Sequence, residues 1–386
     1  MDTVSTRRRA CCARVAILAV ALVLTWSAAR VYFVNGGNWT ALFCSGTYFS
    51  LPPDLDAGTY RVPAAGYDGQ FYRLLAHDPF LAKNYARYVD APQFRFRRCL
   101  VPMAAWLLAC GQQRWIDGAY IAVEMIFLAF GAYWCARLFV RHGRPALWGL
   151  LFVAMPATLA SFDRMLLDGP LTALFAGFLL YCEEERWTRV WVLAMLAGLT
   201  RETGLLLPAA LVADRLFRRD WRGAVGFAAC AAPALAWFAY LAARLPSRGP
   251  VAEIGMPVWG IFRRLLVFRP YAYPAGQLVV RVTDFLAVAG LIACIVLAAI
   301  WLPRRFSPVP ICVRLYACLA LVLGPKVMED PFAFGRVISP LLLWIAMEAV
   351  IRRKWAALAP SLLVSLSVGL VFARPLITIW HALLGR

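Results

Sequence analysis

Long apolar runs, separated by short polar and basic segments, make up most of this chain. A transmembrane helix needs about 20 predominantly apolar residues to cross a hydrocarbon layer about 30 Å thick, and apolar runs recur from residue 15 to residue 372. The apolar residues stand together and do not alternate with polar ones, which is typical of membrane helices and not of strands. The pattern therefore predicts an all-α, polytopic transmembrane protein, in which residues 1–386 form a single integral membrane domain.

Basic clusters between the runs predict the direction of each crossing, because Lys and Arg accumulate on the cytoplasmic side of a membrane. Arg7, Arg8 and Arg9 precede the first run, so we expect the N-terminus in the cytoplasm and the next segment on the outer side. From this start we expect about eleven crossings. They are residues 15–34, 116–140, 146–161, 171–182, 190–213 as two short helices, 223–243, 282–302, 311–323, 337–351 and 355–372.

The run at 190–213 is unusual because Thr200-Arg201-Glu202-Thr203-Gly204 stands in its middle. A single straight helix would bury Arg201 near the centre of the bilayer, at a cost of about 2.5 to 3.5 kcal/mol. It would also move the following basic cluster, residues 215–222, to the outer side. We therefore expect a hairpin of two short helices that turns at Arg201-Glu202.

Two long polar segments are expected outside the membrane, at residues 36–97 and 244–281. The first outer loop should carry short amphipathic helices, and the second should include an interfacial helix at 258–269 whose arginines, Arg263, Arg264 and Arg269, contact lipid headgroups. A further interfacial helix is expected at 100–110, which is too short to cross. Cys44 and Cys99 are both assigned to the outer side, and the sequence leaves open whether they form a disulfide.

A polar and aromatic stretch at residues 66–80 gives the first outer loop its candidate chemistry. Asp68 supplies a carboxylate, and Gly69 permits close approach of backbone to a ligand. The alternative is that Asp68 only caps a helix from Gly69 to His77, which Asp78-Pro79 then ends.

Composition narrows the function classes. The chain has 386 residues, of which 62% are hydrophobic and 16% charged, and its formal net charge is +19. In a soluble protein this charge would suggest nucleic acid, but here the basic residues lie between apolar runs and report topology, so no nucleic-acid partner is expected. The sequence has no P-loop, no Gly-rich dinucleotide loop and no HExxH motif, which disfavours ATPase, Rossmann and zincin chemistry.

The expected topology collects unusual charges on one side of the membrane. Paired carboxylates can serve as a base or hold a metal, and fixed cations can hold a phosphate. The alternatives are that Arg201 pairs with Glu202, that Asp168 caps its helix, and that Lys326 and Arg336 extend to lipid headgroups. The charges on the outer side are Asp68, Asp163, Asp168, Arg201, Glu202, Lys326, Glu329, Asp330 and Arg336.

These features together resemble the GT-C superfamily of membrane glycosyltransferases. The similar segments are residues 66–80, the long loop behind a single N-terminal span, the turn at Asp168, the hairpin at 200–204 and Phe334-Gly335-Arg336-Val337-Ile338-Ser339-Pro340. Within the superfamily, the chain is similar to bacterial polytopic proteins of cell-surface glycopolymer formation. The resemblance implies an enzyme in the cytoplasmic (inner) membrane that uses a polyprenyl-phosphate-linked sugar and a glycan, lipid or protein acceptor on the outer face. Asp68 has no adjacent second acid, so a need for Mg²⁺ or Mn²⁺ is left open.

On this interpretation Asp68 is the base that takes the proton of the acceptor hydroxyl, and Asp168 is a second catalytic carboxylate. Two other functions fit the same pattern: a transporter or flippase of lipid-linked sugars, and a non-catalytic subunit of an envelope assembly. The candidate substrate-binding residues are Tyr67, Gln70, Tyr72, Arg73, Arg201, Glu202, Lys326 and Arg336.

Overall fold

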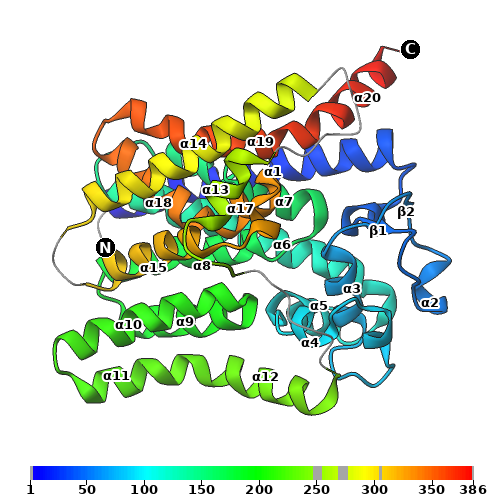
Figure 1. The fold of residues 1–386 in the computed structure, drawn as a ribbon, viewed down its shortest axis with the longest axis horizontal. Helices are drawn as coiled ribbons and strands as arrows, with labels where there is room; N and C mark the ends of the chain where they lie inside the picture. Colours follow the sequence, from blue (N-terminus) through cyan, green and yellow to red (C-terminus); the bar gives the residue numbers. More distant parts are fainter. Residues whose placement is uncertain (1–2, 247–253, 268–276, 304–306, 385–386) are drawn as a thin grey trace.

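The computed structural model describes residues 3–246, 254–267, 277–303 and 307–384. The protein is mostly helical, at 78%, and its helices lie side by side in a bundle (Figure 1). In the described part of the chain the strands are limited to β1 (Ser45–Gly46) and β2 (Arg61–Val62), which pair in parallel. The all-α prediction is confirmed.

Within the residues that the structure describes, five helical segments are long and apolar enough to cross a membrane, which indicates a membrane protein. Two bent pairs raise this number to seven if each pair is one span: Ala146–Phe152 with Pro156–Arg164, bent by 60°, and Pro331–Val337 with Ser339–Ile351, bent by 70°. The five long segments are Arg7–Val34, Gln113–Arg141, Trp221–Arg244, Gln277–Trp301 and Trp355–Leu383.

The expected number of about eleven crossings is therefore not confirmed. Several predicted spans are helices of 12 to 16 residues, such as α8 (Asp168–Glu183), α10 (Leu206–Phe217) and α15 (Pro308–Val322). A helix rises 1.5 Å per residue, so these reach only about 18 to 24 Å. The last span is longer than expected, since its helical turns continue from Trp355 to Leu383 and do not end at residue 372.

The remaining helices have the following bounds. In the first half they are α1 (Thr3–Val34), η1 (Trp39–Phe43), α2 (Pro53–Asp56), α3 (Gly69–His77), η2 (Tyr85–Tyr88), α4 (Pro92–Arg95), α5 (Leu100–Leu108), α6 (Gln113–Arg141), η3 (Ala146–Phe152), α7 (Pro156–Arg164) and α9 (Trp187–Thr200). In the second half they are η4 (Glu202–Leu205), α11 (Trp221–Ala228), η5 (Ala229–Ala231), α12 (Ala232–Arg244), α13 (Trp259–Leu266), α14 (Gln277–Trp301), α16 (Pro325–Met328), α17 (Pro331–Val337), α18 (Ser339–Ile351), η7 (Trp355–Leu358), α19 (Ala359–Gly369), η8 (Leu370–Phe372) and α20 (Ala373–Leu383).

The hairpin expected at Arg201-Glu202 is confirmed. The helix α9 ends at Thr200, Arg201 is extended, and α10 begins at Leu206. Near the end of α10 the Arg215 guanidinium lies 5.0 Å above the Trp187 ring, at the start of α9. The chain thus returns along α9, and Arg201 stands at the turn and not in the middle of a span.

The first loop, residues 36–97, lies with α5 at one end of the bundle, at the right of Figure 1. It contains α3 with the expected bounds, and every residue of α3 from Gly69 to His77 is buried. The helix packs on α5 and α6, and its Phe71, Leu74 and Leu75 belong to a hydrophobic cluster at this end. Because the loop is folded onto the helices, Asp68 is held in a fixed position beside them.

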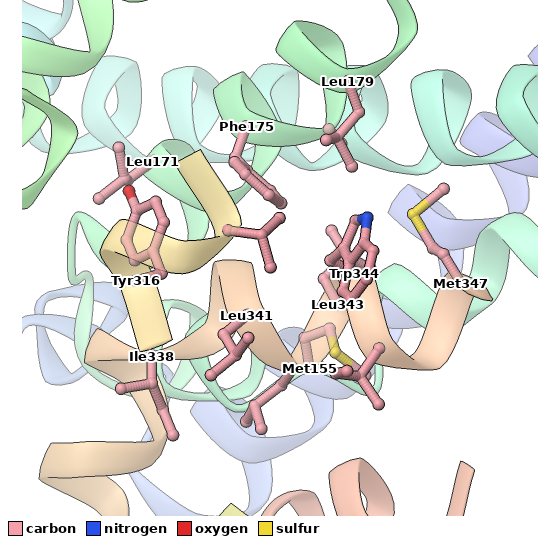
Figure 2. Packing of buried hydrophobic residues seen from close by; sticks show 14 of the residues in the cluster. Met155, Leu171, Phe175, Leu179, Tyr316, Ile338, Leu341, Leu343, Trp344 and Met347 are labelled. Carbon is pink, nitrogen blue, oxygen red and sulfur yellow. The ribbon is translucent and has the colours of Figure 1, made fainter. Parts of the chain in front are cut away.

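The core of the bundle surrounds α8, which packs against α6, α9 and α18. Figure 2 shows Leu171, Phe175 and Leu179 of α8 facing Tyr316 of α15 and the apolar side chains of α18. The Phe175 and Tyr316 rings are in edge contact, with centroids 5.7 Å apart. Lipid is as apolar as these side chains, so close packing, more than exclusion from water, holds such helices together.

The second predicted loop, 244–281, lies partly outside the described residues, which omit 247–253 and 268–276. An interfacial helix was expected at 258–269, and the structure has a helix there, α13. Arg269 is outside the described residues. Arg264 does not face headgroups as expected. It is buried and paired with Asp284 of α14, because a buried guanidinium requires a counter-charge.

The disulfide that the sequence left open is not formed. Cys44 and Cys99 are both free thiols in the structure. Cys99 directly precedes α5, and its backbone N–H donates to Leu199 O at 3.0 Å. Cys44 directly precedes β1.

Candidate functional site

Asp68 is clamped between two arginines from distant parts of the chain. One carboxylate oxygen accepts from Arg336 Nη2 at 3.1 Å, and the other lies 2.8 Å from Arg95 Nη1. Its side chain makes no capping hydrogen bond to α3. The interpretation of Asp68 as a simple helix cap is therefore wrong, and its carboxylate is committed to the two guanidinium groups.

The charge state of Asp68 follows from this environment. Burial alone would raise the pKa of its carboxyl, but the positive charges of Arg95 and Arg336 outweigh burial and hold the pKa below its ordinary value. Asp68 is therefore ionised throughout the physiological pH range. An ionised carboxylate is ready to accept a proton, although the two cations make it a weak base in this arrangement.

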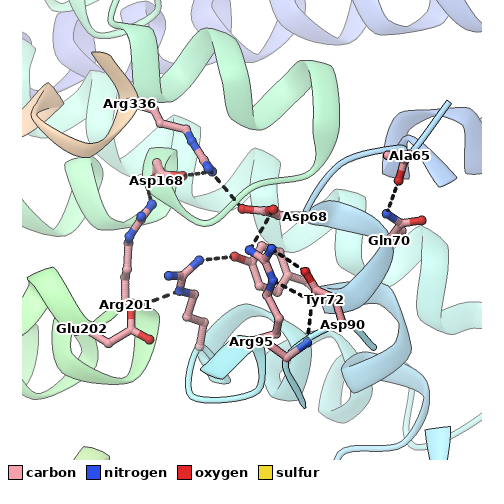
Figure 3. A network of polar contacts seen from close by, with 12 residues as sticks. Ala65, Asp68, Gln70, Tyr72, Asp90, Arg95, Asp168, Arg201, Glu202 and Arg336 are labelled. Carbon is pink, nitrogen blue, oxygen red and sulfur yellow. Dashed lines mark hydrogen bonds and ion pairs between the residues drawn. The ribbon is translucent and has the colours of Figure 1, made fainter. Parts of the chain in front are cut away.

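Asp168 lies on the other side of Arg336, as Figure 3 shows. Arg336 Nη1 donates to Asp168 Oδ2 at 3.1 Å, and Arg201 makes a close ion pair with Oδ1 of the same carboxylate. Asp168 is the first residue of α8 and does not cap it, so the capping alternative is wrong here too. Arg336 thus bridges the two carboxylates that the sequence singled out.

A second arm of contacts starts at Glu202. Its carboxylate accepts from Arg98 Nε at 3.0 Å, and Arg98 Nη1 donates to the Tyr72 hydroxyl at 2.6 Å. Arg201 and Glu202 therefore hold different partners and do not pair with each other as the alternative supposed. Together the two arms form what we call the arginine–carboxylate cluster: Asp68, Asp168, Glu202, Arg95, Arg98, Arg201, Arg336 and Tyr72.

Charge in the cluster is nearly balanced. Four guanidinium groups face three carboxylates, and Asp90 adds a fourth by accepting from Arg95 Nη2 at 2.9 Å. Two of the donors, Arg201 Nε and Arg336 Nε, are buried and have no hydrogen-bond partner among the described residues. An unsatisfied buried donor costs about 1 to 3 kcal/mol, so an anion that accepted from these N–H groups would recover that energy.

Aromatic rings line the cluster on the side of Arg336. The Arg336 guanidinium lies 5.2 Å from the Tyr67 ring centroid, and Tyr67 meets Phe332 edge-on at 5.3 Å. Burial raises the pKa of the Tyr67 hydroxyl to about 12, so it stays protonated. Tyr67 and Tyr72 therefore both contact arginines of the cluster, and each can offer a neutral hydroxyl.

Three predicted binding residues do not join the cluster. Gln70 accepts from Gly46 N–H at 3.1 Å and donates to Ala65 O at 3.0 Å, so it braces the first loop. Arg73 forms a two-point contact with Asp117, at 2.8 and 2.7 Å, in a separate cluster with His77. Lys326 is exposed and has no ion pair within the described ranges.

Gly69 approaches backbone and not a ligand, contrary to the sequence expectation. A Cβ at Gly69 would lie 2.0 Å from Arg164 O, at the end of α7. We expect Gly69→Ala to destabilise the protein by about 1 to 3 kcal/mol, since one of the two backbones must shift. The measurement is thermal unfolding of the purified protein in detergent.

Gly58→Ala is the matched control for this prediction, because Gly58 lies in the same loop and a Cβ there would meet nothing within 4 Å. An equal and small change in both variants would show that α3 is not tightly docked on α7.

Arg95 and Arg98 belong to the cluster but were not predicted from the sequence. Arg95-Phe96-Arg97-Arg98 directly precedes the interfacial helix that was expected at 100–110, and none of its arginines was a candidate site residue. A signal was present, because basic clusters are scarce on the outer side of a membrane, and the predicted topology placed this one there. Such a cluster needs counter-charges, and the structure supplies Asp68, Asp90 and Glu202.

The two central carboxylates do not fit a shared metal site as they are arranged. Arg336 stands between Asp68 and Asp168 and uses one oxygen of each, and a divalent cation there would meet its positive charge. Within the described residues no group of three or more His, Cys, Asp or Glu side chains is placed to hold a metal ion.

An apolar cavity of about 550 Å³ opens beside the cluster. Its walls come from α5, the end of α9, and α12. Two of its lining residues, Cys99 and Leu199, lie one residue from Arg98 and two residues from Arg201 of the cluster. The other lining residues are Phe80, Leu100, Met103, Ala104, Leu107, Pro233, Ala236, Trp237 and Tyr240. The apolar cavity thus begins one residue along the chain from Arg98 of the cluster, and its size suits an organic ligand.

Comparison of the chain with protein-family models, with curated proteins and with solved structures gives no match.

Proposed function

We propose that this protein is a membrane glycosyltransferase that moves a sugar from a polyprenyl-phosphate donor to a glycan, lipid or protein acceptor. The observation that carries the proposal is the convergence of four arginines, three of them buried, and three carboxylates close to an apolar cavity. A lipid-linked phosphate has the same two parts, an anionic group and an apolar chain. We place the reaction on the outer face of the cytoplasmic membrane.

The phosphate of the donor is assigned to Arg201 and Arg336. Both are buried, both have an unsatisfied Nε–H among the described residues, and both already contact Asp168. Guanidinium groups bind phosphate through two parallel hydrogen bonds, which fixes the orientation of the group as well as its charge. The polyprenyl chain would lie in the apolar cavity along α5 and α12.

Asp68 is assigned the proton transfer. The acceptor hydroxyl oxygen forms a bond to the anomeric carbon while the bond from that carbon to the phosphate oxygen breaks. The hydroxyl proton passes to the Asp68 carboxylate, and polyprenyl phosphate leaves with the bonding pair. A donor phosphate that contacts Arg336 would weaken the ion pair between Arg336 and Asp68. Binding of the donor would therefore make the Asp68 carboxylate more basic before the proton transfer.

The orientation behind this proposal predicts a labelling pattern. In a background without the exposed cysteines Cys11, Cys110 and Cys318, we expect Ala57→Cys to react with a membrane-impermeant thiol reagent added to intact cells. Thr188→Cys should react only after the membrane is opened, because the start of α9 lies at the other end of the bundle. Both positions are exposed, so burial does not decide the result. Labelling of Thr188→Cys in intact cells would contradict the proposed orientation.

The function is tested by reconstituting the purified protein in phosphatidylcholine vesicles. The donors are polyprenyl-phosphate-linked hexoses and pentoses labelled in the sugar, and the acceptor is envelope membrane from a strain lacking the gene. We expect protein-dependent transfer of label together with release of polyprenyl phosphate. Movement of intact donor across the vesicle membrane without release would indicate a transporter instead. If no donor is moved and no sugar is transferred, the protein is a non-catalytic subunit and the proposal is overturned.

A further inference from the structure

A second cavity, which is lined by polar side chains, lies at the opposite end of the bundle from the arginine–carboxylate cluster. The helix α8 connects the two, since it begins at Asp168 in the cluster and ends at Glu183, which lines this cavity. Sixteen residues of helix span about 24 Å. The cavity has a volume of about 770 Å³, and none of its residues belongs to the site described above.

The walls of this polar cavity are basic and aromatic. They come from the start of α1, the end of α6 and the turn between α8 and α9. The lining residues are Arg9, Tyr133, Arg137, Arg141, Tyr181, Glu183, Glu184, Glu185, Arg186 and Arg189.

Two of the five arginines are neutralised within the protein. Arg137 makes a close ion pair with Glu184, and Arg141 Nε lies 3.5 Å from Glu183. The other three, Arg9, Arg186 and Arg189, have no ion-pair partner in the described part of the chain. They face a single carboxylate without a partner, that of Glu185, so the cavity keeps an excess of positive charge.

Aromatic contacts hold one wall of the cavity in place. The Arg189 guanidinium lies 5.0 Å from the Tyr181 ring centroid, which orients its N–H groups. The Tyr181 hydroxyl in turn accepts from Trp134 Nε1 at 3.2 Å. The cavity therefore offers positioned donors and not only mobile surface charges.

The cavity borders the lipid-facing surface of the protein. Its Arg9 is on α1, and the next turns of α1 expose Ile17 and Leu18, with 69% and 41% of their surface accessible. Apolar side chains that a membrane helix leaves exposed face lipid tails. A ligand in the cavity can thus place a phosphate among the arginines while its apolar part stays in the membrane beside α1.

We propose that this polar cavity is a binding site for the phosphate headgroup of an anionic membrane phospholipid. The guanidinium groups of Arg186 and Arg189 would contact the phosphate, and Arg9 would contact it from α1. Carboxylates in the lining would accept from headgroup hydroxyls. The volume is larger than a free phosphate needs and suits a phosphodiester with its attached glycerol or similar group. The site is independent of the proposed transfer reaction.

The test compares the purified parent protein with Arg186→Gln/Arg189→Gln in phosphatidylcholine nanodiscs that contain increasing amounts of phosphatidylglycerol. We expect phosphatidylglycerol to raise the unfolding temperature of the parent and to be retained by it in native mass spectrometry. The double variant should bind phosphatidylglycerol about thirtyfold more weakly, since each basic side chain near an anionic surface strengthens binding about five- to sixfold. Its unfolding temperature without phosphatidylglycerol should equal that of the parent, which separates lost binding from lost folding.

Arg219→Gln/Arg222→Gln is the matched control, because these arginines are exposed near the same end of the bundle and outside the cavity. Its response to phosphatidylglycerol should match that of the parent. Equal responses of the parent and of Arg186→Gln/Arg189→Gln would overturn the site. Soluble glycerol phosphate, added to nanodiscs of phosphatidylcholine alone, distinguishes the source of the phosphate. If it raises the unfolding temperature as much as phosphatidylglycerol does, the lipid assignment is overturned.

Discussion

Asp68→Asn is expected to reduce the efficiency of sugar transfer by about 100- to 10,000-fold, the usual contribution of a general base. The amide has nearly the same shape as the carboxylate but cannot accept the proton of the acceptor hydroxyl. The change also removes a largely buried negative charge from between Arg95 and Arg336, so some loss of stability is expected as well. The measurement is kcat/KM for transfer with the purified variant, next to its unfolding temperature.

Two further variants separate catalysis from stability. Asp68→Glu keeps the charge and moves the carboxylate by one methylene, so the ion pairs can persist while transfer falls. Asp163→Asn is the matched control, because Asp163 is a buried carboxylate that pairs with Arg30 and Arg164 outside the cluster. The folded Asp163→Asn variant should transfer sugar at nearly the rate of the parent. Full activity of Asp68→Asn would remove Asp68 as the base.

The sequence predicted the elements whose signals are local. The helix α3 begins at Gly69 and ends at His77 as expected, because Phe71, Leu74 and Leu75 form one apolar face and Asp78-Pro79 stops the helix. The hairpin between α9 and α10 followed from the energy needed to place Arg201 inside a bilayer. Both conclusions rest on residues only a few positions apart.

The number of crossings was not predictable on the same basis. The expected number of spans counted each apolar run as one crossing. The helix α8, however, is apolar because its residues from Asp168 to Leu180 are buried within the protein. The run at 146–161 is divided by Pro156, whose missing N–H and rigid ring end the first helical segment and allow the 60° bend. Run length alone does not separate a membrane span from a buried helix or a bent pair.

Several residues of the cluster were selected from the sequence, but their contacts were not. Asp68 and Arg336 were both selected, yet they are 268 residues apart along the chain, and no local pattern shows that they pair. Gln70 and Arg73 were selected because they neighbour Asp68 in sequence. On a helix, successive residues point in different directions, and these two side chains contact the first loop and α6 instead.

Arg336→Lys is expected to lower the efficiency of transfer by roughly ten- to a hundredfold. The guanidinium uses separate nitrogens for Asp68 and Asp168 and has a third donor, Nε–H, without a partner among the described residues. A lysine supplies one ammonium group, which cannot bridge both carboxylates in the same geometry and still contact a phosphate. Losing one charge-assisted hydrogen bond in the transition state costs about 1.5 to 3 kcal/mol, which gives the expected range.

The control for this variant is Arg264→Lys, which replaces another buried arginine, paired with Asp284 outside the cluster. Both variants keep the positive charge, so both should fold. A fall in unfolding temperature that the two share would report the loss of a buried planar guanidinium group. Only Arg336→Lys should lose transfer, because only Arg336 connects the proposed base, the second carboxylate and the donor phosphate. If Arg336→Lys keeps kcat/KM within about twofold of the parent at equal stability, the arginine serves the structure and the phosphate assignment fails.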